Sequence, residues 1–185
     1  AAAAAAAYLF HIDLEAIADG IANLEEIPGR FERVETGKNY EVVVDYAHTP
    51  DALEQLLEAT KAITKNRVIL VFGATGDRDK GKRPIMGEIA ARLADRVFLT
   101  DEESYNEDPK QIRAMVMEGI SDAGGEAKTE EVKDRRDAIE KALKIARKGD
   151  TVLITGMGHE RFRIVADERL PWNDADVVRE IVGEK

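Results

Sequence analysis

VILVFGATGDRDKGKRPIMGEIAARLADRVFLT, residues 68–100, places two apolar runs on either side of a polar loop and a helical pattern. Val68–Phe72 and Arg96–Thr100 are short, continuous and rich in β-forming residues, which is typical of strands covered on both faces. Between them, Pro84 is expected to open a helix with an apolar inward face. That face carries Met86, Ile89, Ala90 and Leu93. A strand–helix–strand order with short connections favours parallel strands in one sheet.

The same alternation continues on both sides of this unit. Further strands are predicted at Tyr40–Asp45 and Thr151–Thr155. Helices are predicted to begin at Thr49-Pro50 and Asp108-Pro109, where a capping side chain precedes proline. A fourth helix is expected to end in the basic turn from Arg147 to Gly149. The predicted fold class is α/β, a Rossmann-like doubly wound and mostly parallel sheet of about six strands with an antiparallel hairpin at the C-terminal end.

The two ends of the chain depart from this alternation. Phe162–Val165 and Arg169-Leu170 follow the last predicted strand without a helix, which indicates the antiparallel hairpin. A final helix is predicted from Asp174 to Val182. Near the N-terminus, Asp13 could cap a short helix, and Pro28-Gly29 then breaks the chain.

The composition limits the function. The 185 residues suffice for one domain plus an appendage. A net charge of -10 argues against nucleic acid or an anionic membrane as the main partner, because such partners need clustered Lys and Arg. The absence of Cys fits a cytoplasmic protein, and no apolar run approaches the roughly 20 residues that span a membrane. The run Ala1–Ala7 lacks the features of a signal peptide, and we assign it no function.

Polar or glycine-rich loops follow all four predicted strands. They are Asp45–Pro50, Gly73–Arg83, Asp101–Asp108 and Gly156–Glu160. Ligands bind beyond the carboxyl ends of the strands in a doubly wound sheet, so we expect the loops to gather around one binding site. Each loop taken alone is better explained as a solvated connection.

The second loop matches the phosphate-loop pattern G-x-x-x-x-G-K only in part. Arg83 stands where that pattern needs Ser or Thr for magnesium, and Asp77 and Asp79 would place negative charge beside a phosphate. Arg78 and Lys80 suit a carboxylate better, because an arginine can bind both oxygens of a carboxylate. The alternative is a turn held together by Asp–Arg ion pairs.

The first and last loops carry further candidates. Asp45 could accept hydrogen bonds from a ribose or a base, and His48 either faces a ligand or caps the next helix. Gly156 lets the backbone approach a ligand or makes a tight turn, and Glu160 could bind an amine. We expect no metal site, because the histidines lack metal-ligand spacing. The residues by themselves indicate an α/β domain that binds a small charged molecule.

The loop sequences together carry a resemblance. DYAHTPDALE (Asp45–Glu54), GDRDKGKRPIMG (Gly76–Gly87) and GMGHE (Gly156–Glu160) resemble, in order and spacing, the C-terminal domain of Mur ligases. The likeness covers nearly the whole chain and is greatest to the UDP-N-acetylmuramoyl-tripeptide synthetases. It implies a cytoplasmic, ATP-dependent amide-forming ligase that adds the third stem-peptide amino acid to UDP-N-acetylmuramoyl-dipeptide in peptidoglycan synthesis.

The resemblance also implies which domain of the full-length protein binds each substrate. Residues 1–34 would be the tail of a central, ATP-binding domain and a linker, and residues 35–185 the C-terminal domain. ATP and Mg would be bound mainly by the central domain, so the fragment alone would be inactive and holds no catalytic residue. Nucleotide contacts would come from Arg30, Asp45 and His48. The amino acid would be bound by Arg78, Lys80, Gly156 and Glu160.

The third loop departs from the family pattern. Members that add diaminopimelate have D-N-P-R there, whereas this chain has Asp101-Glu102-Glu103-Ser104, without the Arg that would hold the distal carboxylate. We expect Asp101 or Glu102 to attract the ammonium group of a cationic side chain such as that of lysine. The alternative is an acidic solvated loop. Two other function classes stay open: a ligase of the folylpolyglutamate synthetase type, and a Rossmann-like module that binds a metabolite without catalysis.

Overall fold

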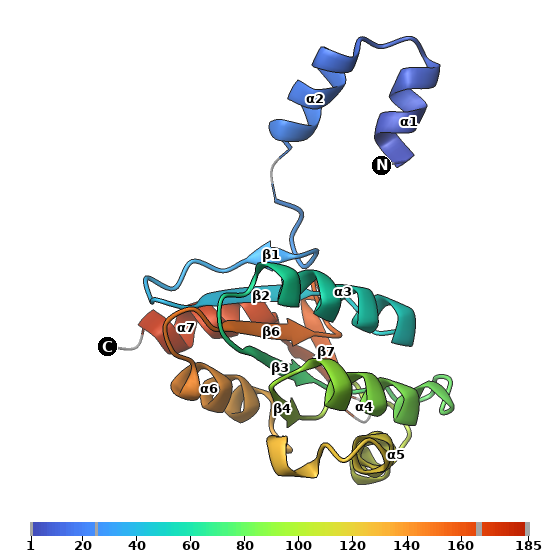
Figure 1. Ribbon diagram of the computed structural model, residues 1–185. Helices are drawn as coiled ribbons and strands as arrows, with labels where there is room; N and C mark the ends of the chain where they lie inside the picture. The colour runs from blue at the N-terminus through green and yellow to red at the C-terminus, as the bar shows by residue number, and fades with distance from the viewer. Residues whose placement is uncertain (1, 25, 166–167, 184–185) are drawn as a thin grey trace.

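A six-stranded sheet forms the centre of the computed structural model, which describes residues 2–24, 26–165 and 168–183. Its strand order is β1-β2-β6-β3-β4-β5 (Figure 1). The strands are β1 (Glu32–Arg33), β2 (Glu41–Asp45), β3 (Val68–Phe72), β4 (Arg96–Leu99), β5 (Thr129–Glu131) and β6 (Thr151–Thr155). All neighbours pair in parallel except β1, which runs antiparallel to β2. The predicted fold class is confirmed.

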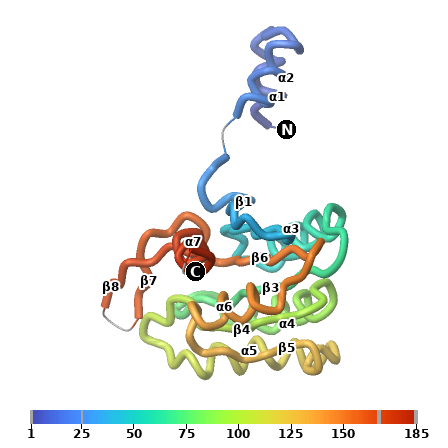
Figure 2. Tube along the Cα trace, turned by 90° about the vertical axis from the view of Figure 1, so that its left-hand side faces the viewer, coloured from blue at the N-terminus to red at the C-terminus, as the bar shows by residue number. Residues whose placement is uncertain are grey.

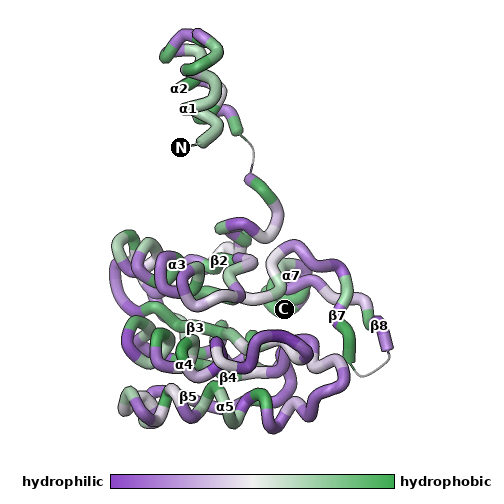
Figure 3. The backbone as a smooth tube through the Cα atoms, turned by 90° about the vertical axis from the view of Figure 1, so that its right-hand side faces the viewer, coloured by the Kyte–Doolittle hydropathy of each residue, from purple (hydrophilic) through white to green (hydrophobic). Residues whose placement is uncertain are grey.

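Helices cover both faces of the sheet. On one face lie α3 (Pro50–Ile63), α4 (Lys82–Leu93) and α5 (Pro109–Asp122), and on the other lie α6 (Arg135–Ile145) and α7 (Asp174–Gly183). Alternate side chains of each strand enter opposite cores, so Val43 packs with the first set and Val42 and Val44 with the second. Figure 3 shows β3 as a continuous hydrophobic segment in the middle of the molecule, as expected for a strand buried on both faces.

Helix ends differ from the predictions at two places. α4 begins at Lys82 rather than at Pro84. Pro84 fits within the first turn because the N–H that proline lacks would have no partner within the helix at that position. α6 ends at Ile145, before the predicted basic turn. The carboxylate of Asp150 holds that turn apart from the helix by accepting hydrogen bonds from Arg147 N (2.8 Å) and Arg67 Nη2 (2.6 Å).

The C-terminal hairpin is confirmed, with β7 (Phe162–Val165) and β8 (Glu168–Pro171) pairing as a separate antiparallel sheet. Near the N-terminus, α1 (Ala2–Leu9) and α2 (Leu14–Ala22) stand away from the sheet in both Figure 1 and Figure 2. Asp13 caps α2 by accepting a hydrogen bond from Glu15 N. Within the described parts of the chain, no helix has the length and apolar character needed to cross a bilayer.

Candidate functional site

A cavity of about 760 Å³ opens at the carboxyl edge of the sheet. All four predicted loops contribute to its lining. Among the lining residues are Tyr46 and His48, Arg78 and Lys82, Glu103 and Tyr105, and Gly156 and Glu160. Because the strands before these loops run parallel, their carboxyl ends meet at one edge and bring the loops together. The expected convergence of the four loops is therefore present.

The first loop is organised around Tyr46. Asp45 accepts hydrogen bonds from Phe31 N (2.7 Å) and Ala47 N (2.8 Å), so its carboxylate joins the segment before β1 to the loop. The guanidinium of Arg30 lies 4.7 Å from the centre of the Tyr46 ring, and the His48 ring meets the same ring edge-on. Of the three predicted nucleotide contacts, only His48 lines the cavity. His48 does not cap the helix, because Thr49 occupies the N-cap of α3.

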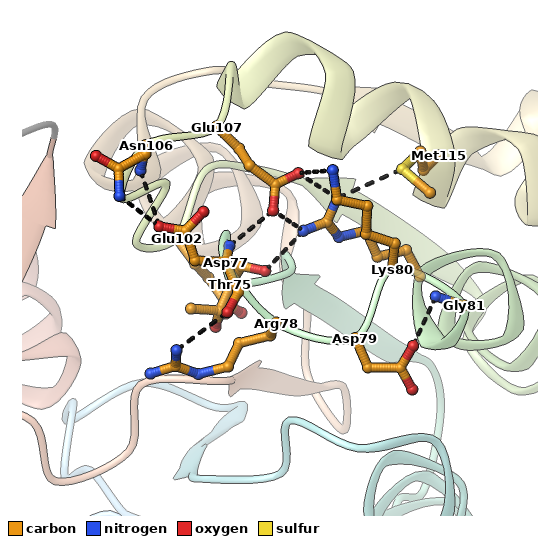
Figure 4. A network of polar contacts seen from close by, with 11 residues as sticks. Thr75, Asp77, Arg78, Asp79, Lys80, Gly81, Glu102, Asn106, Glu107 and Met115 are labelled. Carbon is orange, nitrogen blue, oxygen red and sulfur yellow. Dashed lines mark hydrogen bonds and ion pairs between the residues drawn. The ribbon is translucent and has the colours of Figure 1, made fainter.

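The second loop is held by Glu107 rather than by its own charges (Figure 4). Arg83 is fully buried and donates two hydrogen bonds to Glu107, at 2.9 and 2.8 Å. The ammonium of Lys80 lies 3.1 Å from the same carboxylate. These contacts, with that of Arg83 largest, lower the pKa of Glu107 to about 2. Lys80, predicted to bind the amino acid, is thus paired with Glu107 and does not line the cavity.

Two cations of this loop do line the cavity. Arg78 donates to Asp77 O (3.2 Å) and its guanidinium lies 5.2 Å from the centre of the Tyr105 ring, while Figure 4 shows it extending away from Glu107. Lys82, which the sequence did not single out, donates to His48 O at 2.8 Å. Burial lowers the pKa of Lys82. No ion pair of Arg78 or Lys82 occurs among the described residues.

In the third loop, the structure places Asp101 and Glu102 against other side chains and away from the cavity lining. Asp101 forms an ion pair with Arg113 of α5. Glu102 is only 5% exposed and accepts hydrogen bonds from Gly73 N (3.2 Å) and Thr75 Oγ1 (3.1 Å), and burial raises the pKa of its carboxyl. Neither side chain lines the cavity, because each is held by partners in the core or on α5.

Of the acidic residues 101–103, Glu103 is the one that lines the cavity, where Arg78 contributes the opposite charge. Its carboxylate accepts hydrogen bonds from the Tyr105 hydroxyl (3.1 Å) and from Ile164 N (3.2 Å). Glu160 accepts one from the Tyr46 hydroxyl at 3.4 Å. Burial, followed by the nearest carboxylate, raises the pKa of each tyrosine. Sequence reasoning missed Glu103, because nothing in a run of three acidic residues tells which one faces the site.

Gly156 packs directly against the buried side chain of Glu102, which leaves no room for a Cβ. It has φ +107°, and a Cβ there would lie 1.9 Å from Glu102 Oε1. A glycine is therefore required both by the backbone conformation and by the buried carboxylate packed against it. The φ of +107° fits the tight turn considered for Gly156, and the close approach of a ligand to its backbone stays a prediction.

The charges of the cavity suit a zwitterion. Arg78 and Lys82 contribute cations, and Asp79, Glu103 and Glu160 contribute carboxylates. Within the described parts of the chain, none of the five takes part in an ion pair. An unpaired arginine can bind a carboxylate through two parallel hydrogen bonds, and an unpaired carboxylate can accept from an ammonium group. The cavity can therefore orient a small molecule that carries both charges.

Comparisons with known proteins agree on one family. The sequence profile described as "Mur ligase, glutamate ligase domain" matches residues 29–158. The UDP-N-acetylmuramoyl-L-alanyl-D-glutamate--2,6-diaminopimelate ligase of Syntrophomonas wolfei is 43% identical over 94% of this chain, which spans 35% of that protein. A solved structure of a ligase with the same name has a TM-score of 0.79 and 39% identity, and the match covers 98% of this chain and 37% of the other.

A second group of ligases shares the fold. The bifunctional folylpolyglutamate synthase/dihydrofolate synthase of Yersinia pestis has a TM-score of 0.60 and 21% identity, over 80% of this chain and 32% of the other. At that identity the match indicates the fold alone. This chain thus spans about a third of the length of the relatives it matches.

Proposed function

We propose, from the premise that this chain belongs to the Mur ligase family and matches its glutamate ligase domain, that it is the C-terminal domain of an ATP-dependent amide-forming ligase. The proposed reaction adds the third stem-peptide amino acid to UDP-N-acetylmuramoyl-dipeptide in the cytoplasm, during peptidoglycan synthesis. The observation that carries the proposal is the cavity whose unpaired cations and carboxylates suit an amino acid. The greater likeness to diaminopimelate ligases favours it over a folylpolyglutamate synthetase or a module without catalysis.

In this reaction, the carboxylate of the dipeptide would take the γ-phosphoryl group of ATP, which gives an acyl phosphate and releases ADP. The amine of the incoming amino acid would then attack the acyl carbon, phosphate would leave, and the nitrogen would lose its extra proton to give the amide. The share of this domain is to hold the amino acid beside the acyl group and to exclude water when the domains close. Arg78 would bind a carboxylate of the amino acid, and Glu160 an ammonium group.

The residues of this domain fit only part of the ATP site. Arg30, Tyr46 and His48 form a cationic and aromatic patch that suits contact with a nucleotide. The loop with the partial phosphate-loop pattern does not suit phosphates, because Asp77 N already donates to Glu107 and the Asp79 carboxylate lines the cavity. No cluster of three or more metal-binding side chains occurs among the described residues. As the family resemblance implies, we propose that the phosphates and Mg are bound mainly by the central domain of the full-length protein.

An Arg78→Gln variant of the full-length protein tests the proposal. We expect KM for the amino acid to rise about 10- to 100-fold, because a hydrogen-bonded charge is lost, while KM for ATP stays unchanged. The matched control is Arg92→Gln, since Arg92 is an exposed arginine of α4 paired with Glu54. We also expect the isolated 185-residue chain to form no amide. Absence of ATP-dependent amide synthesis by the full-length protein, or turnover by the isolated chain, would contradict the proposal.

A further inference from the structure

Glu160 lies at the end of a loop that has little rigidity of its own. The fourth loop contains Gly156 and Gly158, both with a positive φ, and glycine has access to many backbone conformations. Within the loop, Glu160 N donates to Met157 O at 2.9 Å. The Tyr46 hydroxyl reaches the Glu160 carboxylate only at 3.4 Å. The position of Glu160 therefore depends on further contacts from outside the loop.

The short segment between β8 and α7 supplies such contacts. The side chain of Asn173 donates from Nδ2 to Glu160 O at 3.1 Å. Its Oδ1 accepts a hydrogen bond from Asp176 N at 3.0 Å, as the side chain of an N-cap residue does. Beside it, Trp172 N donates to Arg161 O at 3.0 Å. Because the amide nitrogen of Asn173 meets a carbonyl and its oxygen meets an N–H, only one orientation of the amide satisfies both partners.

A buried ion pair anchors this segment. Arg135 of α6 and Asp174 of α7 are both 0% exposed, and two hydrogen bonds of 2.9 and 2.7 Å join them. The same guanidinium donates to Thr155 O at 2.8 Å, at the end of β6 and directly before the fourth loop. Trp172 Nε1 also donates to Asp174, at 2.9 Å. Asn173 is therefore fixed relative to the strand from which the fourth loop leaves, because a bidentate arginine–carboxylate pair holds its neighbour in a defined geometry.

We propose that Asn173 is a positioning residue, which holds the backbone of Glu160 and so sets where the Glu160 carboxylate lies in the cavity. The inference rests on the proposed function, in which Glu160 binds an ammonium group of the incoming amino acid. Asn173 itself does not line the cavity, so it acts through Glu160 and not by contact with the amino acid. The segment before the last helix thereby takes part in amino-acid binding.

Two variants of the full-length protein separate the hydrogen bond to Glu160 from the cap of α7. Asn173→Ser and Asn173→Asp both keep a side-chain oxygen that caps a helix, and both lose the amide N–H that reaches Glu160 O. We expect the KM for the amino acid to rise about 5- to 30-fold in each, because a displaced carboxylate binds the ammonium group less well. The amino acid is L-lysine or meso-2,6-diaminopimelate, whichever the wild type uses better.

Other measured values should stay unchanged in both variants. These are the KM for ATP and the midpoint of urea denaturation, because the nucleotide contacts and the helix cap are kept. The negative charge added in Asn173→Asp would by itself attract an ammonium group, so a loss in that variant comes from position and not from charge. Asp13→Ser, at the exposed N-cap of α2, is the matched control, and Glu118→Gln, at an exposed position of α5, is a second one. Neither control should change the KM for the amino acid.

A double-mutant cycle with Glu160→Gln tests whether Asn173 acts through Glu160. Glu160→Gln alone should raise the KM for the amino acid about 10- to 100-fold, because the charge that faces the ammonium group is lost. Asn173→Ser added to it should change that KM less than about twofold, since the exact position of an uncharged side chain matters little. A residue that served only the fold would cause the same further loss in both backgrounds.

The outcomes separate this inference from the proposed function. An unchanged KM for the amino acid in Asn173→Ser and Asn173→Asp would overturn the inference, while ATP-dependent amide synthesis by the wild type still upheld the function. Equal losses from Asn173→Ser with and without Glu160→Gln would also overturn it, as would an equal rise of KM for ATP. A full-length wild type that forms no amide with any amino acid would remove the proposed function, and the inference with it.

Discussion

At the scale of single residues, Glu107 decides whether the second loop keeps its shape. Its carboxylate forms ion pairs with Arg83 and Lys80 and accepts a hydrogen bond from Asp77 N. These contacts lower its pKa to about 2. A lowered pKa in the folded state stabilises the fold above the unfolded-state pKa, and this contribution disappears as the pH falls towards 2. The free energy of unfolding should therefore fall between pH 4.5 and 2, in part because Glu107 becomes protonated.

A Glu107→Gln variant isolates this effect. At pH 6 we expect the variant to be about 2 kcal/mol less stable, because the buried guanidinium of Arg83 loses its charged acceptor. The difference from the wild type should shrink below pH 4.5, where the wild type loses the same charge. Urea denaturation at pH 6 and pH 3 measures both differences, with Glu118→Gln as control. A difference that stays constant between the two pH values would show that Glu107 does not act through its charge.

Single residues also mark the limit of sequence reasoning about the site. The sequence pointed to His48, Arg78, Gly156 and Glu160, and all four line the cavity, although their binding roles stay predictions. It could not separate Glu103 from its two acidic neighbours. That choice depends on cations elsewhere in the chain, since Arg113 on α5 pairs with Asp101 and Arg135 on α6 approaches Glu102.

At the scale of elements, two glycines set the contact between α4 and α5. A Cβ at Gly119 would lie 1.8 Å from Pro84 O, and a Cβ at Gly87 would lie 2.1 Å from Val116 O. The backbones of the two helices therefore touch, and no side chain fits between them. Since Lys82 is the first residue of α4, this contact also helps to position Lys82 at the cavity.

A Gly119→Ala substitution should separate these helices. We expect the free energy of unfolding to fall by about 1–3 kcal/mol, because the added methyl group forces backbone shifts that outweigh the gain in helix propensity. Gly20→Ala on α2 is the matched control, since no atom lies within 4 Å of a Cβ there and the same change should not destabilise the chain. Thermal and urea unfolding of both variants compare them directly. A Gly119→Ala variant as stable as the wild type would refute the close contact.

Elements were predictable where their pattern was local. The four central strands and their helices carry apolar runs and capping residues that need no knowledge of the rest of the chain. The edge strands β1 (Glu32–Arg33) and β5 (Thr129–Glu131) are short and polar, so neither has a pattern that distinguishes it from a loop. They are strands because β2 and β4 offer free edges with which they pair.

At the scale of the whole molecule, the predicted linker, taken here as residues 28–34, joins the site to the sheet. Phe31 N donates to Asp45, Arg30 lies against Tyr46, and Val34 is 4% exposed in the core beside β2. The helices α1 and α2, by contrast, stand away from the sheet and carry exposed apolar side chains. The predicted division after residue 34 stays a prediction, and β1 lies on its N-terminal side.

Two shortened chains can locate that division. A chain that begins at Pro28 keeps β1 and should unfold within about 0.5 kcal/mol of the 185-residue chain, because it loses only segments outside the core. A chain that begins at Glu35 loses β1 and the buried side chain of Val34, and should be less stable by about 2 kcal/mol or more. Urea denaturation of the three chains measures both differences. If the chain from Pro28 were as unstable as the chain from Glu35, α2 and not the linker would complete the folded unit. Arg30 would then be held against Tyr46 by the preceding segment instead of by the sheet.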